Sequence, residues 1–415
     1  MPILRHYLKV FSTLFAEKKL LTLSICIFLT WLVQAIDLVV GVIFGISSLT
    51  KVKGRGPKDG KFPKVSIIFA ARNEAKDVEA AARSMLAQDY PDFEVIAVND
   101  RSTDGTLAIL ESLAPSPCPF PPGERERVRG KLKVLNISAL PSGWLGKTHA
   151  LWRGYLISKG DWLLFTDADV NFHPSTLRAS IQAASDYRLD HLALFPQLVT
   201  KKIIEAIFAH YFILSFLRFL RPWAAPNPKS PAFVGVGAFN LVRREVYEAI
   251  GTHEKLALEV VDDVGLGRRV KKAGYSQRAM SGVDFVSVKW VEGFKGVLAS
   301  LQKNAFAGMN YQLSLVFLAT ASIFMLDALP FFLFFYCQWP AWIFSLLTVI
   351  LIWISNRACL FSEKQRESWL WVAHPLGSLL FLLVLWRSAY TAIRERGIRW
   401  RDTFYSLDGL KNARK

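Results

Sequence analysis

Three long stretches of this chain are almost free of charged residues, and they constrain its fold more than any other feature. Asp37 is the only charged residue from Leu20 to Thr50, and Asp327 is the only one from Leu313 to Ser355. The stretch from Trp369 to Trp386 contains none. A bilayer core requires about 20 mainly apolar residues in a helix, because no water there can hydrogen bond to exposed backbone groups. The sequence therefore predicts an integral membrane protein with a large polar middle region.

The overall composition fits a membrane protein and excludes several other classes. Hydrophobic residues make up 52% of the 415 residues, which is too apolar for a soluble enzyme or a disordered tail protein. The four cysteines lack the spacing of a disulfide scaffold or a zinc site. The linker 51–64, after the first apolar stretch, carries six basic residues and one acidic residue. Because basic flanks stay in the cytoplasm, we expect the polar region to lie there, at an inner or plasma membrane.

Short runs of β-forming residues alternate with helical composition in the polar region. Val65–Ala70 and Phe93–Val98 are two such runs, and residues 75–87 between them have helical composition. Leu132–Ile137 and Asp161–Thr166 are two further runs. A strand–helix–strand unit implies parallel strands, so the sequence predicts an α/β domain.

Polar clusters follow three of these predicted strands. They are Arg72-Asn73-Glu74, Asn99-Asp100 and Asp167-Ala168-Asp169. In open parallel sheets, ligands bind beyond the carboxyl ends of the strands. Because three separate strands bring acidic residues to one edge, we expect a binding site there rather than solvated loop tips.

The pair Asp167 and Asp169 suits a divalent cation. Two carboxylates one residue apart can hold Mg²⁺ or Mn²⁺, which would also bind diphosphate oxygens. Such a pair occurs by chance in many surface loops, but here it directly follows an apolar strand. A cation would neutralise a leaving diphosphate, so no protein acid would be needed on that side.

Two further clusters carry charge at predicted helix starts. Lys147 follows Gly146 and opens a helix, which suits phosphate binding, with a solvated lysine as the alternative. Asp262 and Asp263 stand between an apolar pair and a helical pattern. A carboxylate whose pKa is raised by its neighbour or by burial is a candidate general base. The alternative is that the two acids serve only the helix, one as its N-cap and the other as an acid in its first turn. The two interpretations are compatible if Asp262 caps the helix and Asp263 is the base.

Taken in order, these motifs resemble those of the family-2 glycosyltransferases. The matching motifs are Ala70–Glu74, Val98–Thr106, Gly146-Lys147, Thr166–Asp169, and Asp262-Asp263 with Leu266. The resemblance covers roughly residues 62–310. It implies a GT-A (Rossmann-like) α/β catalytic domain in the cytoplasm and a nucleotide-sugar donor. With the apolar stretches, it implies one N-terminal and two to three C-terminal transmembrane helices.

On the donor side, the resemblance implies a nucleoside pocket, a diphosphate contact and a pair of metal ligands. The nucleoside pocket would be lined by Ala71, Arg72, Glu74 and Asp100. The diphosphate would meet Lys147. Asp169 would bind the metal, and Asp167 would touch the metal or the ribose.

On the acceptor side, the resemblance implies that Asp263 is the general base. Asp262 stands where the family has a glutamate, which keeps the carboxylate and changes only its reach. Gly237 and Ala238 resemble the acceptor-side loop of the family. Gln302 would also lie on the acceptor side.

The stretch from Gln302 to Phe306 departs from processive members of the family. Processive polysaccharide synthases carry a Gln-x-x-Arg-Trp motif, and this chain lacks its Arg and Trp. The departure implies transfer of a single sugar. Gly296–Tyr311 and the tail Gly397–Tyr405 resemble the branch that acts on terpenoid or sphingoid lipids, including the hopanoid- and carotenoid-associated enzymes.

Two apolar regions leave their membrane location open. Ile203–Leu220 is interrupted by charged residues, so we expect an amphipathic helix at the interface, with a buried helix of the α/β domain as the alternative. Three C-terminal apolar segments, at about 313–336, 339–356 and 369–391, would put the tail outside if all crossed the membrane. The basic residues of the tail favour the inside.

These inferences divide the chain into five regions. The regions are an anchor (1–50), a nucleotide-sugar-binding half (51–200), an acceptor-side half with interfacial helices (201–310), C-terminal transmembrane segments (311–393) and a basic tail (394–415). We expect an inverting enzyme that moves one sugar from a nucleotide-diphosphate sugar to a lipid hydroxyl. A polyprenyl-phosphate sugar synthase and a processive polysaccharide synthase are the alternatives. A membrane transporter or nucleic-acid-binding protein is the non-enzyme alternative, although acids at the strand ends disfavour nucleic acid as a partner.

Overall fold

The chain forms two compact units, each assembled from segments that are distant in sequence. A computed structural model describes residues 2–52, 60–114, 126–129, 131–289, 293–302, 304–359, 368–400 and 403–412. An α/β unit contains residues 45–200, 220–292 and 396–415, and a helical unit contains residues 1–44, 201–219 and 293–395. Residues 53–59 of the predicted linker, together with Lys303, Arg401 and Asp402 of the motifs above, lie outside the described residues. The finer division into five regions stays a prediction.

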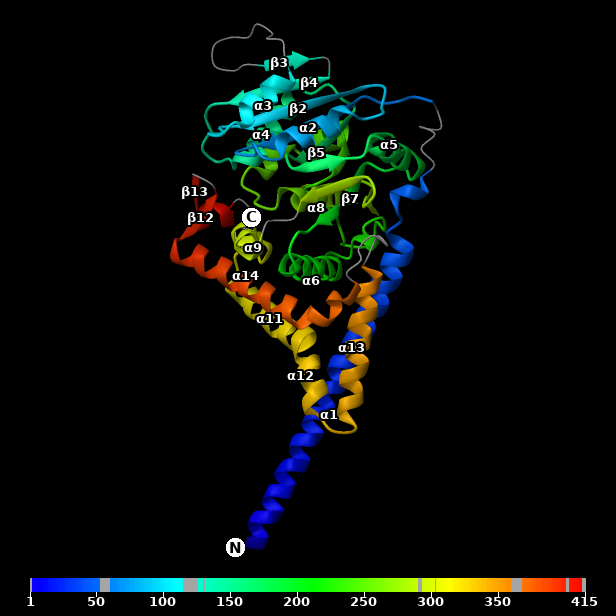
Figure 1. Ribbon diagram of the computed structural model, residues 1–415, viewed down its shortest axis with the longest axis vertical. Helices are drawn as coiled ribbons and strands as arrows, with labels where there is room; N and C mark the ends of the chain where they lie inside the picture. Colours follow the sequence, from blue (N-terminus) through cyan, green and yellow to red (C-terminus); the bar gives the residue numbers. More distant parts are fainter. Residues whose placement is uncertain are drawn as a thin grey trace. The chain divides into compact units, whose positions relative to one another are not determined.

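The α/β unit is built on an eight-stranded sheet with the order β10-β7-β9-β5-β1-β2-β4-β3 (Figure 1). Its centre consists of the four strands expected from the sequence, namely β1 (Val65–Ala71), β2 (Phe93–Asp100), β4 (Leu132–Ile137) and β5 (Trp162–Asp167). Strand β1 pairs in parallel with β2 and β5, and β2 pairs in parallel with β4. The predicted α/β fold is confirmed. The outer strands are β3 (Glu126–Arg129), β7 (His191–Phe195), β9 (Asn240–Arg243) and β10 (Gln277–Ser281).

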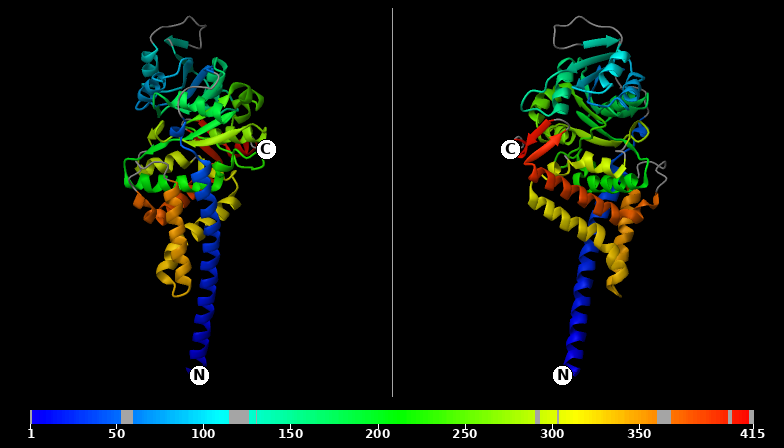
Figure 2. Two further views of the ribbon diagram at one scale, coloured as in Figure 1. Left: turned by 90° about the vertical axis from the view of Figure 1, so that its right-hand side faces the viewer. Right: turned by 60° about the vertical axis from the view of Figure 1, so that its left-hand side comes forward.

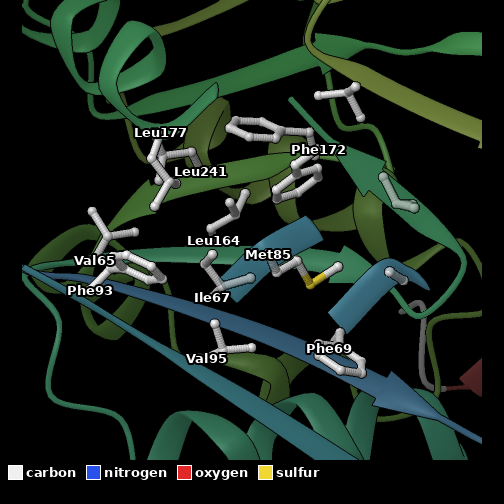
Figure 3. Close-up of a cluster of buried hydrophobic side chains, with 14 of the residues drawn as sticks. Val65, Ile67, Phe69, Met85, Phe93, Val95, Leu164, Phe172, Leu177 and Leu241 are labelled. Atoms are coloured by element: carbon white, nitrogen blue, oxygen red, sulfur yellow. The ribbon is translucent and has the colours of Figure 1, made fainter. Parts of the chain in front are cut away.

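Helices cover both apolar faces of this sheet. Successive side chains of a strand point to opposite faces. Ile67 and Phe69 pack with Met85 on one face (Figure 3), whereas Ile68 packs with Phe165 on the other. The first face is covered by α2 (Val78–Leu86), α3 (Thr106–Leu113) and α5 (Thr176–Asp186). The second is covered by α4 (Gly146–Leu156), α7 (Arg244–Ala249) and α8 (Asp262–Lys272). Burial on both faces explains why the central strands are nearly continuous apolar runs.

Two smaller β structures belong to the same unit. One is a three-stranded sheet of β6 (Val170–Phe172), β11 (Val286–Lys289) and β8 (Gln197–Val199). The other is a C-terminal hairpin of β12 (Gly397–Trp400) and β13 (Thr403–Ser406), followed by α15 (Leu407–Asn412). The right-hand view in Figure 2 shows the hairpin as two red arrows near the end of the chain.

Among its described residues, the helical unit contains five helical segments that are long and apolar enough to cross a membrane. One of them begins in α1 (Pro2–Val40), and the prediction of one N-terminal and several C-terminal membrane helices is confirmed at this level. Helix α13 packs along α1. The Ser24 and Ser345 hydroxyl oxygens are 3.5 Å apart, and the ring centres of Phe28 and Phe344 are 5.8 Å apart. Besides α1, the α-helices described in this unit are α6 (Ile203–Leu220), α9 (Gly293–Gln302), α10 (Asn304–Gly308), α11 (Leu313–Ile323), α12 (Leu329–Tyr336), α13 (Ala341–Ala358) and α14 (His374–Arg394). Helices α11 and α12 together form one of the five candidate membrane segments.

Asp327, the one charge in its long apolar stretch, is paired inside the helical unit. It lies in a π-helical turn, Phe324–Ala328, between α11 and α12. Its carboxylate accepts hydrogen bonds from Arg218 Nη1 and from the Tyr211 hydroxyl, each 2.7 Å long. Both of these partners come from α6. Because an unpaired buried charge is strongly destabilising, the pair explains how this unit accommodates both charged residues.

Candidate active site

The predicted site residues of the α/β unit converge at the carboxyl ends of its central strands. Asp100 ends β2, Asp167 ends β5, and Ala71 ends β1 between them. The parallel register pairs Ala71 with Asn99, so the three strands end at one edge of the sheet. Ligands bind at this edge in open parallel sheets, which makes it the candidate active site.

Asp100 is held between two arginines. Its Oδ2 is 3.7 Å from Arg72 Nη1, and both of these side chains are buried. Its Oδ1 accepts a hydrogen bond from Arg101 Nε at 2.8 Å. The arginines fix the carboxylate at the end of β2, where it can accept hydrogen bonds from a ligand.

The loops that follow β1 and β2 are tied to each other. The Asn73 side-chain oxygen accepts a hydrogen bond from the Thr103 backbone N–H at 2.8 Å, and the Asn73 N–H donates to Ser102 Oγ at 3.0 Å. Asn73 and Arg101 both have a left-handed backbone, with φ of 55°. Such strained positions persist only where the surroundings hold them, so the two loops are preorganised.

Lys147 lies between acidic side chains from two other elements. Its Nζ is 2.7 Å from Asp167 Oδ1 and 3.4 Å from Asp262 Oδ1. Burial alone would lower the pKa of Lys147, but the adjacent Asp167, Asp262 and Asp263 raise it above its ordinary value. The lysine therefore stays charged at any physiological pH and adds a fixed positive charge to the site.

Asp169 lies where negative charge accumulates. Burial, together with the nearby carboxylates Asp167 and Glu74, raises its pKa to about 7. In the part of the chain that the structure describes, no group of three or more His, Cys, Asp or Glu side chains could hold a metal ion. Mg²⁺ is commonly held by one or two carboxylates together with substrate phosphates. Asp167 and Asp169 fit such a site, which diphosphate oxygens would complete.

Asp262 and Asp263 open helix α8 at the same site. The N-cap position is Val261, so the expectation that Asp262 caps the helix is wrong, and the Asp262 carboxylate faces Lys147 instead. Burial, together with the charge of Asp262, raises the pKa of Asp263 to about 6. A carboxyl with such a pKa is ionised at neutral pH and basic enough to accept a proton.

The predicted acceptor-side glycine lies beside these acids. A Cβ atom at Gly237 would be 2.8 Å from Asp167 Oδ2 and 3.3 Å from Asp263 Oδ2. The neighbouring Ala238 carbonyl accepts a hydrogen bond from Thr166 Oγ1 at 2.8 Å, which ties this loop to β5. A larger residue at Gly237 would therefore project between the two carboxylates.

One predicted acceptor residue lies outside the α/β unit, and two residues near the strand ends were not predicted. Gln302 belongs to the helical unit, where its carbonyl accepts a hydrogen bond from the Ser388 hydroxyl, and its contact with an acceptor stays a prediction. Sequence reasoning missed Arg101, although its charge directly after Asp100 was a usable signal. It also missed Tyr405 of β13, which comes close to Asp100 and Arg101, and no local pattern could have found it.

Comparison with known protein families matches residues 66–251 to the family described as glycosyl transferase family 2. A 4,4'-diaponeurosporenoate glycosyltransferase from Staphylococcus aureus strain MRSA252 is 24% identical over 355 residues, covering 83% of this chain and 88% of that protein. The enzyme of the same name from strain USA300 is 24% identical over 249 residues, covering 59% and 61% of the two chains.

Among solved structures, the α/β fold has a counterpart in a mannosyltransferase from Pyrobaculum calidifontis, determined in complex with GDP-Man and Mn²⁺. The two proteins are 16% identical and align with a TM-score of 0.50 over 91% of this chain and 99% of the other. At this level of identity the likeness concerns the fold alone.

Proposed function

We propose that this chain, whose residues 66–251 match glycosyl transferase family 2 and whose fold has a counterpart in a solved mannosyltransferase, transfers a single sugar from a nucleotide-diphosphate sugar to a membrane lipid. In this proposal the reaction inverts the anomeric centre, the acceptor is a lipid hydroxyl, and the active site faces the cytoplasm.

One observation carries the proposal, namely that a candidate base and a fixed cation occupy the same small site. Asp263 and Asp167 both approach Gly237, and Asp167 is paired with Lys147. A sugar transfer needs a proton acceptor on the acceptor side and positive charge on the leaving-group side. Asp263 would supply the first and Lys147 the second.

The reaction would proceed as a direct displacement. The acceptor hydroxyl oxygen attacks the anomeric carbon while Asp263 takes its proton, and the bond to the diphosphate breaks on the opposite face. Lys147 would stabilise the negative charge that develops on the diphosphate, and the amide groups at the start of α4 would contribute in the same way. Asp100, held by Arg72, would bind the nucleoside.

A divalent cation fits the donor side of this site. Asp167 and Asp169 would hold Mg²⁺ or Mn²⁺, which would neutralise charge on the departing diphosphate when bound. The raised pKa of Asp169 agrees with this assignment, because it reflects burial together with the negative charge of Asp167 and Glu74, which a cation would offset.

The relatives support an apolar acceptor and suggest a second candidate for its reactive group. They are named for a carboxylate, 4,4'-diaponeurosporenoate. A carboxylate acceptor arrives ionised and needs no general base. The burial and raised pKa of Asp263 favour a hydroxyl, and the substitution of Asp263 described in the Discussion separates the two.

The proposal is tested with membranes containing the protein and either UDP-sugars or GDP-sugars. We expect release of the nucleoside diphosphate that depends on an added lipid, and a lipid product heavier by one sugar in mass spectrometry. Acceptors ending in a hydroxyl, a carboxylate and a phosphate are compared. Preference for the phosphate would replace the proposal with a polyprenyl-phosphate sugar synthase, and release without any lipid acceptor would contradict it.

We expect the product to carry a single sugar even with excess donor and long incubation. The segment from Gln302 to Phe306 lacks the Arg and Trp of processive synthases, so a newly added sugar has no indole ring on which to stack. The measurement is a mass spectrum of the product lipids over time. A series of products that differ by one hexose would restore the processive alternative.

The connectivity of α6 supports an interfacial location for this helix. It is long and apolar enough to cross a membrane. However, β8 before it and β9 after it belong to the same α/β unit, so both ends of the helix lie on one side. We therefore propose that α6 lies along the membrane surface.

The same reasoning applies to the C-terminal helices. The segment 293–395 leaves the α/β unit and returns to it, since residues 396–415 belong to that unit. An even number of crossings is required, whereas three candidate spans lie between these points. We propose that the α11–α12 segment and α13 cross as a hairpin beside α1 and that α14 does not cross.

Cysteine labelling in a cysteine-free background measures this topology. We expect Gln338→Cys, in the turn between α12 and α13, to react with an impermeant maleimide applied outside intact cells. Lys411→Cys in α15 should react only after the membrane is opened, because it lies on the same side as the α/β unit. Labelling of Lys411→Cys in intact cells would contradict the hairpin and favour three C-terminal crossings.

A further inference from the structure

The glycine loop, which we define as residues 234–237, packs directly against helix α8. A Cβ atom on Gly235 would overlap the Asp263 carbonyl oxygen, and one on Gly267 would overlap the Val234 carbonyl oxygen. Glycine allows two backbones to approach this closely, whereas any larger residue would force them apart. The glycine loop and the start of α8 therefore contact each other through their backbones at both positions.

One buried carboxamide joins these two backbones. Gln277 of β10 accepts a hydrogen bond from the Val234 N–H at 2.7 Å and donates one to the Gly267 carbonyl at 2.9 Å. A carboxamide can do both at once, because it carries an acceptor oxygen and a donor nitrogen. Gln277 is buried, so water does not compete for these bonds. It ties the glycine loop to α8 about one turn after Asp263.

A second buried carboxamide makes the same kind of bridge closer to the candidate base. The side-chain oxygen of Asn240, in β9, accepts a hydrogen bond from the Val236 N–H at 3.3 Å, and its nitrogen donates to the Asp263 carbonyl at 3.4 Å. The buried His191 places its Nε2 3.0 Å from the same oxygen and so helps to orient the amide. The bonds of Asn240 to loop and helix are longer than those of Gln277, which is therefore the stronger bridge.

The two bridges hold the end of the glycine loop against the candidate base. Gly237 ends the loop, and a Cβ atom there would be 3.3 Å from Asp263 Oδ2. A general base must lie within about 2.6–3.2 Å of the oxygen whose proton it takes. A movement of α8 relative to the loop would change the space in which that oxygen sits. Misplacement by about 1 Å can lower a rate by about 10²-fold.

We propose that Gln277 and Asn240 are positioning residues for sugar transfer, which hold the glycine loop and Asp263 at the spacing that the acceptor hydroxyl requires. This inference rests on the proposed function, which makes Asp263 the general base. Both residues act through the base rather than on the substrate, since they bind backbone groups of the loop and the helix.

Donor binding depends on a different set of contacts. Asp100 is paired with Arg72 at the ends of β2 and β1, and Lys147 of α4 is paired with Asp167 of β5. We therefore expect the loss of a bridge to lower the kcat of transfer and to leave the binding of a nucleoside diphosphate unchanged. A general loss of folded structure would lower both.

Gln277→Met tests the proposal, because it removes both hydrogen-bonding groups and keeps the length of the side chain. The probes are UDP and GDP, used as inhibitors of whichever nucleotide sugar supports turnover with a hydroxyl lipid. We expect kcat to fall about tenfold or more, with the inhibition constant of the diphosphate unchanged. Asn240→Ala, which removes the other bridge, should show the same separation of kcat from diphosphate binding. Unchanged kcat in both variants would overturn the proposal.

Gln88→Met is the matched control, because Gln88 is also a buried amide that bridges two backbone groups. It donates a hydrogen bond to the His173 carbonyl and accepts one from the Leu177 N–H, at the start of α5. We expect its kcat to stay close to that of the wild type. A fall as large as that of Gln277→Met would mean that any buried amide bridge has this effect, and it would overturn the proposal.

Combining Gln277→Met with Asp263→Asn separates positioning of the base from other effects. Once the base is removed, the bridge has nothing left to position, so the double variant should turn over as slowly as Asp263→Asn alone. Mass spectrometry of the product lipid after long incubation measures this residual turnover. A further loss as large as that in Gln277→Met alone would overturn the proposal, as would loss of diphosphate binding in both bridge variants. A wild type that transfers no sugar from UDP-sugars or GDP-sugars would instead contradict the proposed function.

Discussion

Asp263→Asn is expected to abolish sugar transfer while leaving nucleotide binding close to that of the wild type. The amide has nearly the shape of the carboxylate but cannot take the proton of the acceptor hydroxyl. Loss of a general base typically lowers the rate by about 10²- to 10⁴-fold. Donor binding should persist, because Lys147 and Asp100 remain in place. Turnover with a hydroxyl acceptor and inhibition by the nucleoside diphosphate are the two measurements.

The pH profile gives an independent readout of the same base. The pKa of Asp263 is raised to about 6, so kcat/KM in the wild type should fall as the pH drops through about 6 and the carboxylate takes up a proton. Asp284→Asn, at an exposed position outside the site, serves as the matched control and should retain the wild-type profile. Wild-type turnover in Asp263→Asn would refute the assignment. Asp262 would then be the next candidate for a hydroxyl acceptor, and a carboxylate acceptor would need no base at all.

The central strands and the site they carry were predictable because local physics determines them. Burial on both faces forces continuous apolar runs, so Val65–Ala70 and Phe93–Val98 are recognisable without any partner. Parallel strands bring their carboxyl ends to one edge, so Asp100, Asp167 and the residues after β1 had to lie close together. Predicting that the motifs after these strands lie together required only that the strands be parallel neighbours, and the strand–helix–strand pattern of the sequence indicates this.

The remaining features depend on contacts between distant parts of the chain. Strand β9 inserts antiparallel between β5 and β7, and its short run Asn240–Arg243 has no pattern that distinguishes it from a loop. The C-terminal hairpin belongs to the α/β unit although the whole helical segment 293–395 precedes it in the chain. The pairing of Asp327 with Arg218 likewise joins residues that are far apart in the chain. Sequence periodicity reports on single elements, so it could not predict any of these three.

Asp169→Ala is expected to lose both sugar transfer and the effect of metal on nucleotide binding. In the proposed site Asp169 and Asp167 hold a divalent cation together with the diphosphate, and one carboxylate with the phosphate oxygens would bind it weakly. Charge stabilisation by a metal is worth several kcal/mol, so we expect turnover to fall about 10²-fold or more. The binding measurement is calorimetry of the nucleoside diphosphate with and without Mn²⁺.

Asp92→Ala is the matched control, because the Asp92 side chain is 56% exposed and forms a surface pair with Lys64. It should bind the nucleoside diphosphate more tightly with Mn²⁺ than without it, as the wild type does. The pKa of Asp169 is raised to about 7 by burial and by its acidic neighbours, so protons compete with the cation near neutral pH. In the wild type the gain in affinity from Mn²⁺ should therefore shrink as the pH falls through about 7. Equal affinity of Asp169→Ala and the wild type in the presence of Mn²⁺ would place the metal elsewhere or remove it from the mechanism.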